Sequence, residues 1–117
     1  MLSLIVDDDP YIRTYVKALL QRDGFQTLEA EGGNSALEIV TRFSGCVDLI
    51  VTDIQMPNGD GLSFAKAVRR KFPLVPIILV SGDARPNSAF EFVKKPFTSV
   101  TLARAVRKLV PRIAKTA

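Results

Sequence analysis

Short apolar runs alternate along this chain with segments in which apolar residues recur at helical spacing. Four runs, at residues 2–6, 47–52, 76–80 and 90–93, are too short and too apolar for amphipathic helices. Each is typical of a strand buried in a parallel sheet, and residues 25–30 make a further strand. Because strands and helices alternate, the pattern predicts an α/β fold.

Four helices are predicted between or after these strands. Asp9 caps the first helix, which ends at Gly24. A turn at residues 32–34 precedes the second helix, and Thr98 or Ser99 caps the last. The residues expected to face the sheet are, helix by helix, Ile12, Val16, Leu19 and Leu20; Ala36, Leu37 and Val40; Leu62, Ala65, Val68 and Phe72; and Leu102, Ala103, Val106, Leu109 and Val110.

The connection between the fourth and fifth strands is too short for a helix. It runs from Ser81 to Ala89 and contains Gly82 and Pro86, whereas a parallel crossover that includes a helix needs about 10 to 12 residues or more. We therefore expect residues 83–89 to form a loop or at most one helical turn, so that the fourth helix is missing or reduced. The apolar flank beside these strands would then be exposed, and it could bind a second copy of the chain or a dedicated partner.

Composition places the chain among globular proteins of one domain, residues 1–117. Its length can enclose a full core, and 47% hydrophobic with 24% charged residues is ordinary for that class. An apolar run of 18 residues and a signal-peptide pattern are both absent, so we expect a cytoplasmic protein without membrane contact. The single cysteine, Cys46, excludes an internal disulfide and is expected to be a buried, inert thiol.

The chain is basic, with a formal net charge of +4 and an isoelectric point near 9.5. We interpret most of the basic residues as a solvated surface, although the last helix could dock an acidic partner. Direct nucleic-acid binding is not expected, because no recognition-helix motif or aromatic interleaving accompanies the charge. Nine of the 16 basic residues gather in two groups, Lys66, Arg69, Arg70 and Lys71 in the third helix, and Arg104, Arg107, Lys108, Arg112 and Lys115 in the last helix and tail.

Five polar residues lie where predicted strands give way to loops: Asp7, Asp8, Asp53, Ser81 and Lys95. Since the carboxyl ends of parallel strands open onto one edge of the sheet, these side chains should meet in one cleft. Three crowded carboxylates repel one another and favour a hard divalent cation with oxygen ligands, Mg²⁺ more than zinc. The ammonium and the hydroxyl, with that ion, could hold the oxygens of a phosphoryl group. The remaining carboxylate would then be a nucleophile that forms an aspartyl-phosphate.

Four motifs, in this order, resemble those of the receiver domain of two-component response regulators. They are LIVDDD at residues 4–9, VTDIQMPNGDG at 51–61, ILVSGDA at 78–84 and VKKPF at 93–97. Order and spacing match over nearly the whole chain, except in the short connection after Ser81. The resemblance implies a doubly wound five-stranded parallel sheet with the flavodoxin-like strand order 2-1-3-4-5, and a site at the switch point between strands one and three.

The same resemblance assigns roles to the acidic residues. It makes Asp53 the phosphoacceptor, which receives its phosphoryl group from phosphohistidine on a sensor histidine kinase or a histidine phosphotransfer protein. Asp8 and Asp53 would bind Mg²⁺ directly. Gln55 would add its backbone carbonyl to the metal, and Asp7 would hold a metal-bound water. Gln55 and Asp83 also match two variable positions that tune how fast water removes the phosphate.

Three further residues match family positions that hold the phosphoryl group and report its presence. Ser81 stands where the family has threonine or serine. Lys95, rather than Lys94, is the lysine immediately before the proline. Phe92 occupies the aromatic position that swings inward when the hydroxyl moves toward phosphate. The resemblance therefore implies a conformational change on phosphorylation.

The sequence contains no histidine. This absence excludes Ser-His-Asp hydrolysis, histidine-containing zinc sites and any role as a phosphohistidine donor. The chain can receive a phosphoryl group from histidine but cannot supply one in that form.

The expected function is that of a non-enzymatic signalling domain that assists its own phosphorylation and dephosphorylation. A stand-alone receiver is preferred over a receiver cut from a larger DNA-binding or enzymatic regulator. A magnesium-dependent phosphatase or a nucleotide-binding protein of similar fold is the third alternative. Residues 7–9 read Asp-Asp-Asp, without the spacing or the threonine of such a phosphatase's motif, and the sequence has no glycine-rich phosphate loop.

Overall fold

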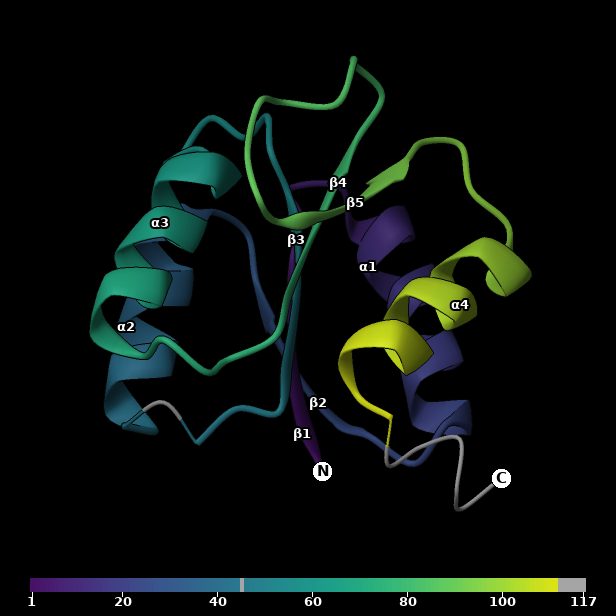
Figure 1. Cartoon of the computed structure of the whole chain (residues 1–117), viewed down its shortest axis with the longest axis horizontal. Helices are drawn as coiled ribbons and strands as arrows, with labels where there is room; N and C mark the ends of the chain where they lie inside the picture. Colours follow the sequence, from purple (N-terminus) through teal and green to yellow (C-terminus); the bar gives the residue numbers. More distant parts are fainter. Residues whose placement is uncertain (45, 112–117) are drawn as a thin grey trace.

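The computed structural model describes residues 1–44 and 46–111, which form five strands and four helices. In chain order these are β1 (Leu2–Val6), α1 (Pro10–Arg22), β2 (Gln26–Ala30), α2 (Gly33–Arg42), β3 (Leu49–Asp53), α3 (Gly61–Lys71), β4 (Ile77–Ser81), β5 (Glu91–Lys94) and α4 (Ser99–Leu109). All strand pairs are parallel, and the strands lie in the order β2-β1-β3-β4-β5 (Figure 1). The α/β fold and its flavodoxin-like strand order are thereby confirmed.

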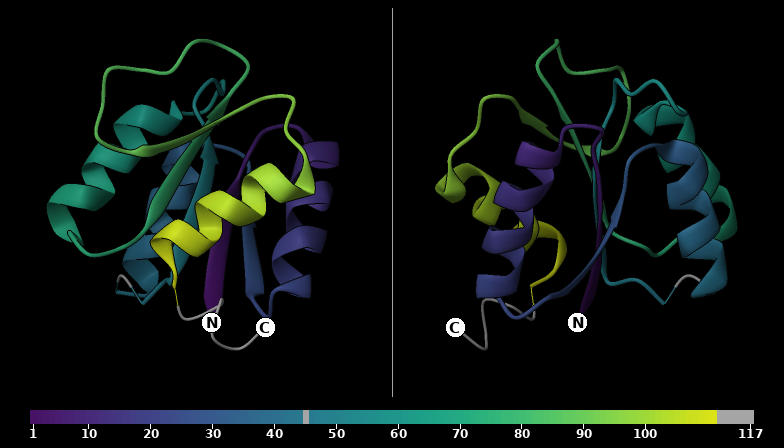
Figure 2. Two further views of the ribbon diagram at one scale, coloured as in Figure 1. Left: turned by 45° about the vertical axis from the view of Figure 1, so that its right-hand side comes forward. Right: turned by 180° about the vertical axis from the view of Figure 1, so that it is seen from behind.

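Helices cover both faces of the sheet, α1 and α4 on one face and α2 and α3 on the other (Figure 1, Figure 2). Neighbouring residues of a strand point to opposite faces. Ile5 and Val80 therefore join the apolar core under α1 and α4, whereas Leu4 and Leu79 join the core under α2 and α3. All residues of β3 and β4 are buried, as expected for central parallel strands. The carboxyl ends of β3 and β4 are thus held in place by the buried, tightly packed strands that lead to them.

The two central strands begin and end later than predicted. Instead of residues 47–52, β3 spans Leu49 to Asp53, and instead of residues 76–80, β4 spans Ile77 to Ser81. Asp53 and Ser81 are therefore the last residues of strands rather than the first residues of loops. Since both strands have neighbours on both sides, backbone pairing places these two residues firmly.

The predicted turn at residues 32–34 is wrong, because α2 begins at Gly33 with Gly32 as its N-cap. The N–H of Gly33 donates to the Gly59 carbonyl oxygen at 2.9 Å, so the loop after β3 docks on the start of α2. A Cβ at Gly32 would lie 2.3 Å from the Asn58 carbonyl oxygen. This close approach, and not a turn, explains the glycine.

Helix α4 buries a slightly different stripe from the predicted one. Thr98 is its N-cap, and the threonine side chain accepts a hydrogen bond from the first turn. Ala105 is buried beside Leu102 and Val106, whereas Ala103 is only half-buried. Because residues three and four positions apart share a helix face, Ala105 rather than Ala103 faces the sheet with Leu102.

Surface features of the described residues differ in part from expectation. Cys46 is exposed rather than buried, because it lies in the connection between α2 and β3, and such connections run over the surface. None of the described helices is long and apolar enough to cross a bilayer. Two basic residues of the tail, Arg112 and Lys115, lie outside the described residues. The basic residues of α4 are exposed, as expected of a solvated face: Arg104, Arg107 and Lys108.

Residues 82–90, between β4 and β5, form no helix, which confirms the prediction made from their number. Their loop rises above the carboxyl ends of the strands and returns to β5 (Figure 1). The expected open flank is partly covered, because Phe90 and Phe92 are half-buried against the core under α2 and α3. The Arg69 guanidinium lies 5.4 Å from the centre of the Phe90 ring and donates to two carbonyl oxygens of the α3–β4 connection. These side chains cover part of the surface that a helix would cover.

Candidate functional site

Three carboxylates meet at the carboxyl edge of the sheet. Asp7 and Asp8 directly follow β1, and Asp53 ends β3, which pairs with β1. One carboxylate oxygen of each residue lies within 4.8 Å of the others. Asp7 and Asp53 are buried, with 3% and 8% of their surface exposed, whereas Asp8 is exposed. We call these three residues the acid cluster, and the topology brings them together as predicted.

Lys95 reaches the acid cluster from the residue that follows β5. Its Nζ donates to Oδ2 of Asp7 at 3.0 Å and lies 3.4 Å from Oδ2 of Asp53. Burial alone lowers the pKa of Lys95, but the hydrogen bond to Asp7 and the attraction of both carboxylates outweigh burial and leave the pKa raised. The ammonium is therefore charged at neutral pH. Lys94, by contrast, is exposed.

The pKa of Asp53 is raised despite the neighbouring ammonium. Loss of hydration on burial raises it most, Lys95 lowers it, and the charge of Asp7 raises it again. Three carboxylates against one ammonium leave an excess of negative charge. A divalent cation complements that excess, and the cluster offers only oxygen ligands, which suit Mg²⁺ better than a softer metal. The residues present therefore fit the expected ion.

Hydrogen bonds link the two loops that flank the acid cluster. Ser81, buried at the end of β4, accepts a hydrogen bond at Oγ from the backbone N–H of Asp83 at 3.0 Å. The Asp83 carboxylate in turn accepts a hydrogen bond from the side-chain amide of Gln55, in the loop after β3. Ser81 keeps its hydroxyl proton to donate, because a hydroxyl group can both accept and donate. Gln55 and Asp83, which the sequence suggested separately, are thus hydrogen-bonded partners.

Phe92 lies apart from the acid cluster. It pairs with Leu79 between β5 and β4, and its half-buried ring packs against the core under α2 and α3. Among the described contacts, none joins Phe92 or the backbone carbonyl of Gln55 to the cluster. Their expected roles therefore remain predictions.

Two supports of the site were not predicted. Arg13 of α1 donates to the backbone carbonyl of Asp7 at 2.7 Å. Gly61, the first residue of α3, packs so closely that a Cβ there would lie 1.8 Å from the Asp53 carbonyl oxygen. Both contacts involve main-chain atoms outside the helix that carries the contacting residue, and hydrophobic periodicity does not indicate such contacts. The available signals were a glycine directly after the helix cap and an arginine next to the apolar stripe of α1.

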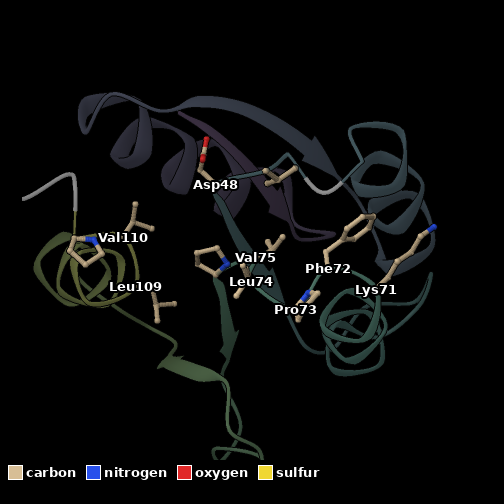
Figure 3. Close-up of a pocket in the computed structure, with 11 residues that line it drawn as sticks. Asp48, Lys71, Phe72, Pro73, Leu74, Val75, Leu109 and Val110 are labelled. Atoms are coloured by element: carbon tan, nitrogen blue, oxygen red, sulfur yellow. The ribbon is translucent and has the colours of Figure 1, made fainter.

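A separate groove lies at the opposite, amino-terminal edge of the sheet (Figure 3). It has a volume of about 460 Å³ and is lined mainly by apolar residues of the α3–β4 connection and the end of α4, such as Leu74 and Leu109. Its charged lining residues are Asp48 and Lys71. Because carboxylates do not cluster in this lining, the acid cluster rather than the groove is the candidate site for metal binding and phosphoryl transfer.

The family model described as the response regulator receiver domain matches residues 3–107. The chemotaxis protein CheY of Pseudomonas aeruginosa is 34% identical, and the match covers 97% of this chain and 98% of that protein. The sensor kinase CckA of Brucella abortus is 32% identical over 93% of this chain, but the match spans only 12% of the kinase.

Solved structures give the same result. The response regulator TrrA of Thermotoga maritima, in complex with Mg(2+)-BeF, is 37% identical with a TM-score of 0.81. The match covers 92% of this chain and 97% of the TrrA chain. The receiver domain of the hybrid histidine kinase CckA is 31% identical with a TM-score of 0.83, and the match covers 94% and 99% of the two chains. This chain therefore belongs to the family of receiver domains of two-component response regulators.

Proposed function

We propose that this receiver accepts a phosphoryl group from a phosphohistidine donor onto Asp53, in a reaction that requires Mg²⁺. The position of Asp53 carries the proposal, because its carboxylate lies beside those of Asp7 and Asp8 and the ammonium of Lys95. The acid cluster would hold the ion, with the Gln55 carbonyl as a further ligand. When bound, Mg²⁺ supplies positive charge to the oxygens of the transferred group.

The transfer exchanges one bond at phosphorus for another. A carboxylate oxygen of Asp53 forms an O–P bond while the P–N bond of the donor breaks and its electron pair returns to the imidazole. Oδ1 of Asp53 accepts a hydrogen bond from Ile54 N at 2.9 Å, and Oδ2 lies near Lys95. The carboxylate is thus oriented before a donor arrives. The Lys95 ammonium and the Ser81 hydroxyl would then hold oxygens of the new phosphoryl group.

Incubation with acetyl phosphate and Mg²⁺, followed by intact mass measurement, tests this proposal. Acetyl phosphate replaces the protein donor, so the result does not depend on knowing the kinase. We expect the mass of one phosphoryl group to be gained only when both reagents are present. Equal gains with and without Mg²⁺, or no gain at all, would contradict the proposal.

In this proposal the receiver acts in the cytoplasm, and its donor is a sensor histidine kinase or a histidine phosphotransfer protein. Because the chain has no histidine, the phosphohistidine must belong to another protein or domain. We favour a single receiver domain that acts alone, by its similarity to CheY, whose length the match covers almost fully. The CckA match, which spans a small part of a kinase, represents the alternative, a receiver within a larger protein.

We propose that the loop at residues 82–90 reports phosphorylation. Asp83, near its start, donates to Ser81, and its end leads into β5 with Phe92. A movement of the Ser81 hydroxyl toward the phosphoryl group would break or shift this hydrogen bond and so displace the loop. Phe90 and Phe92, which cover the flank of the missing helix, would then be rearranged for a partner protein or a second copy of the chain.

Replacement of Lys95 by alanine is expected to leave phosphorylation possible but to reduce the conformational response, because the ammonium that pairs with the phosphoryl oxygens is lost. The response can be measured as the shift of the amide resonances of residues 82–94 on addition of acetyl phosphate and Mg²⁺. Lys94→Ala is the matched control, since Lys94 is the exposed neighbour, and it should respond like the parent. Equal losses in the two variants would contradict the role of Lys95 and the strand register that assigns it.

A further inference from the structure

Arg13 connects α1 to the backbone of the loop that carries Asp7 and Asp8. Its Nη1 donates to the Asp7 carbonyl oxygen at 2.7 Å, and its Nε donates to Oε1 of Glu29, on β2, at 3.2 Å. Only 14% of the Arg13 side chain is exposed. Glu29, which lies outside the acid cluster, therefore holds the guanidinium in place while its other nitrogen binds the loop.

The carbonyl that Arg13 binds belongs to the peptide group between Asp7 and Asp8. That group is planar and rigid, so its orientation sets the direction in which the chain continues from Asp7 to Asp8. Other contacts hold the remaining parts of Asp7, because its N–H donates to the Ala30 carbonyl oxygen at 3.1 Å and its Oδ1 accepts from Asp9 N at 2.9 Å. Among the hydrogen bonds of the described residues, the bond from Arg13 is the one that acts on the peptide joining the two carboxylates.

We propose that Arg13 is a positioning residue for the Mg²⁺ site, which orients the Asp7 and Asp8 carboxylates by fixing the peptide between them. The inference rests on the proposed function, since it takes the acid cluster as the site of the ion. It gives Arg13 no contact with the ion or with the phosphoryl group.

The charge of Arg13 and its hydrogen bond to the Asp7 carbonyl predict opposite effects of its loss on the affinity for Mg²⁺. A guanidinium is positively charged and repels a nearby cation, so by charge alone its removal would tighten Mg²⁺ binding. Loss of the hydrogen bond would instead allow the peptide to turn and would weaken Mg²⁺ binding. Residues that orient metal ligands typically account for about 10- to 100-fold in affinity. The direction of the change therefore separates the two effects.

Calorimetric titration with Mg²⁺ of the parent, Arg13→Gln, Arg13→Lys and Lys17→Gln at one ionic strength tests the inference. Lys17 is the matched control, because it lies one turn further along α1 and also pairs with Glu29, at 3.6 Å. We expect the Kd for Mg²⁺ to rise about tenfold in Arg13→Gln. It should rise several-fold in Arg13→Lys, which keeps the charge but loses the two-bond fork. Lys17→Gln should bind Mg²⁺ as tightly as the parent or slightly more tightly.

Two further readouts separate positioning from a general loss of structure. In the metal-free protein, the amide resonance of Asp8 should shift in both Arg13 variants but not in Lys17→Gln. At saturating Mg²⁺, the rate of phosphorylation by acetyl phosphate in the Arg13 variants should return to within about twofold of the parent, because Arg13 does not touch the reacting atoms.

Parental or tighter Mg²⁺ binding by both Arg13 variants would overturn the inference and leave the proposed function standing. If Arg13→Gln does not fold, Arg13→Lys decides in the same way. A parent protein that does not bind Mg²⁺ would overturn the proposed function, and the inference with it.

Discussion

Asp53→Asn is expected to abolish the mass gain seen with acetyl phosphate and Mg²⁺, because an amide lacks the nucleophilic carboxylate oxygen. The matched control is Asp60→Asn, which changes a carboxyl group in the loop that follows β3 and keeps the N-cap of α3, since asparagine caps as well as aspartate. That variant should be phosphorylated like the parent. A mass gain in Asp53→Asn equal to that of the parent would place the acceptor elsewhere.

The loss of phosphorylation in Asp53→Asn should not come from unfolding. The pKa of Asp53 is raised in the folded state, chiefly by burial, so the folded protein binds this proton more tightly than the unfolded chain does. The parent therefore loses stability as the pH rises from about 3.8, the ordinary value, through the folded value, and it stays less stable above that value. Asparagine does not titrate, so the variant should melt at or above the melting temperature of the parent at neutral pH.

Mg²⁺ is expected to raise the melting temperature without any phosphodonor, because it relieves the repulsion within the acid cluster and binds only the folded state. At a free Mg²⁺ concentration of 100 times the Kd, the gain in the free energy of unfolding is about 2.7 kcal/mol. Asp8→Ala should abolish this gain, because it removes a ligand. The same change should raise the melting temperature of the metal-free protein, because it removes one of the repelling charges.

Asp9→Asn is the control for Asp8→Ala. Asp9 belongs to the same acidic run, but its side chain caps α1 by accepting a hydrogen bond from Tyr11 N at 2.9 Å, a role that asparagine can fill. Its response to Mg²⁺ should equal that of the parent. If Asp8→Ala also responds like the parent, the ion binds elsewhere or not at all.

The acid cluster could be predicted from the sequence because it depends on topology. Once Asp7, Asp8, Asp53 and Lys95 are recognised as residues at the ends of parallel strands, their convergence follows from the sheet alone. The missing helix could also be predicted, because too few residues separate Ser81 from β5 for a helix to form. These inferences use only the order and length of elements.

Contacts with main-chain atoms of another element or loop could not be predicted in this way. The sequence pattern predicts a turn at Gly32, whereas the close approach of the loop after β3 explains this glycine. Nothing in the periodicity of α1 indicates that Arg13 binds the Asp7 carbonyl. The partial covering of the β4–β5 flank depends on how the Phe90 ring packs beneath Arg69. Side-chain packing of this kind cannot be predicted from the number of residues in a connection.

The most direct test of the central claim is to locate the phosphoryl group on the chain. Borohydride reduces an acyl phosphate to an alcohol, so a phosphorylated aspartate becomes homoserine, and peptide mass spectrometry then identifies the residue. After treatment with acetyl phosphate and Mg²⁺, we predict homoserine at position 53 and unchanged aspartate at positions 7 and 8. Homoserine at another position, with Asp53 unmodified, would contradict the account.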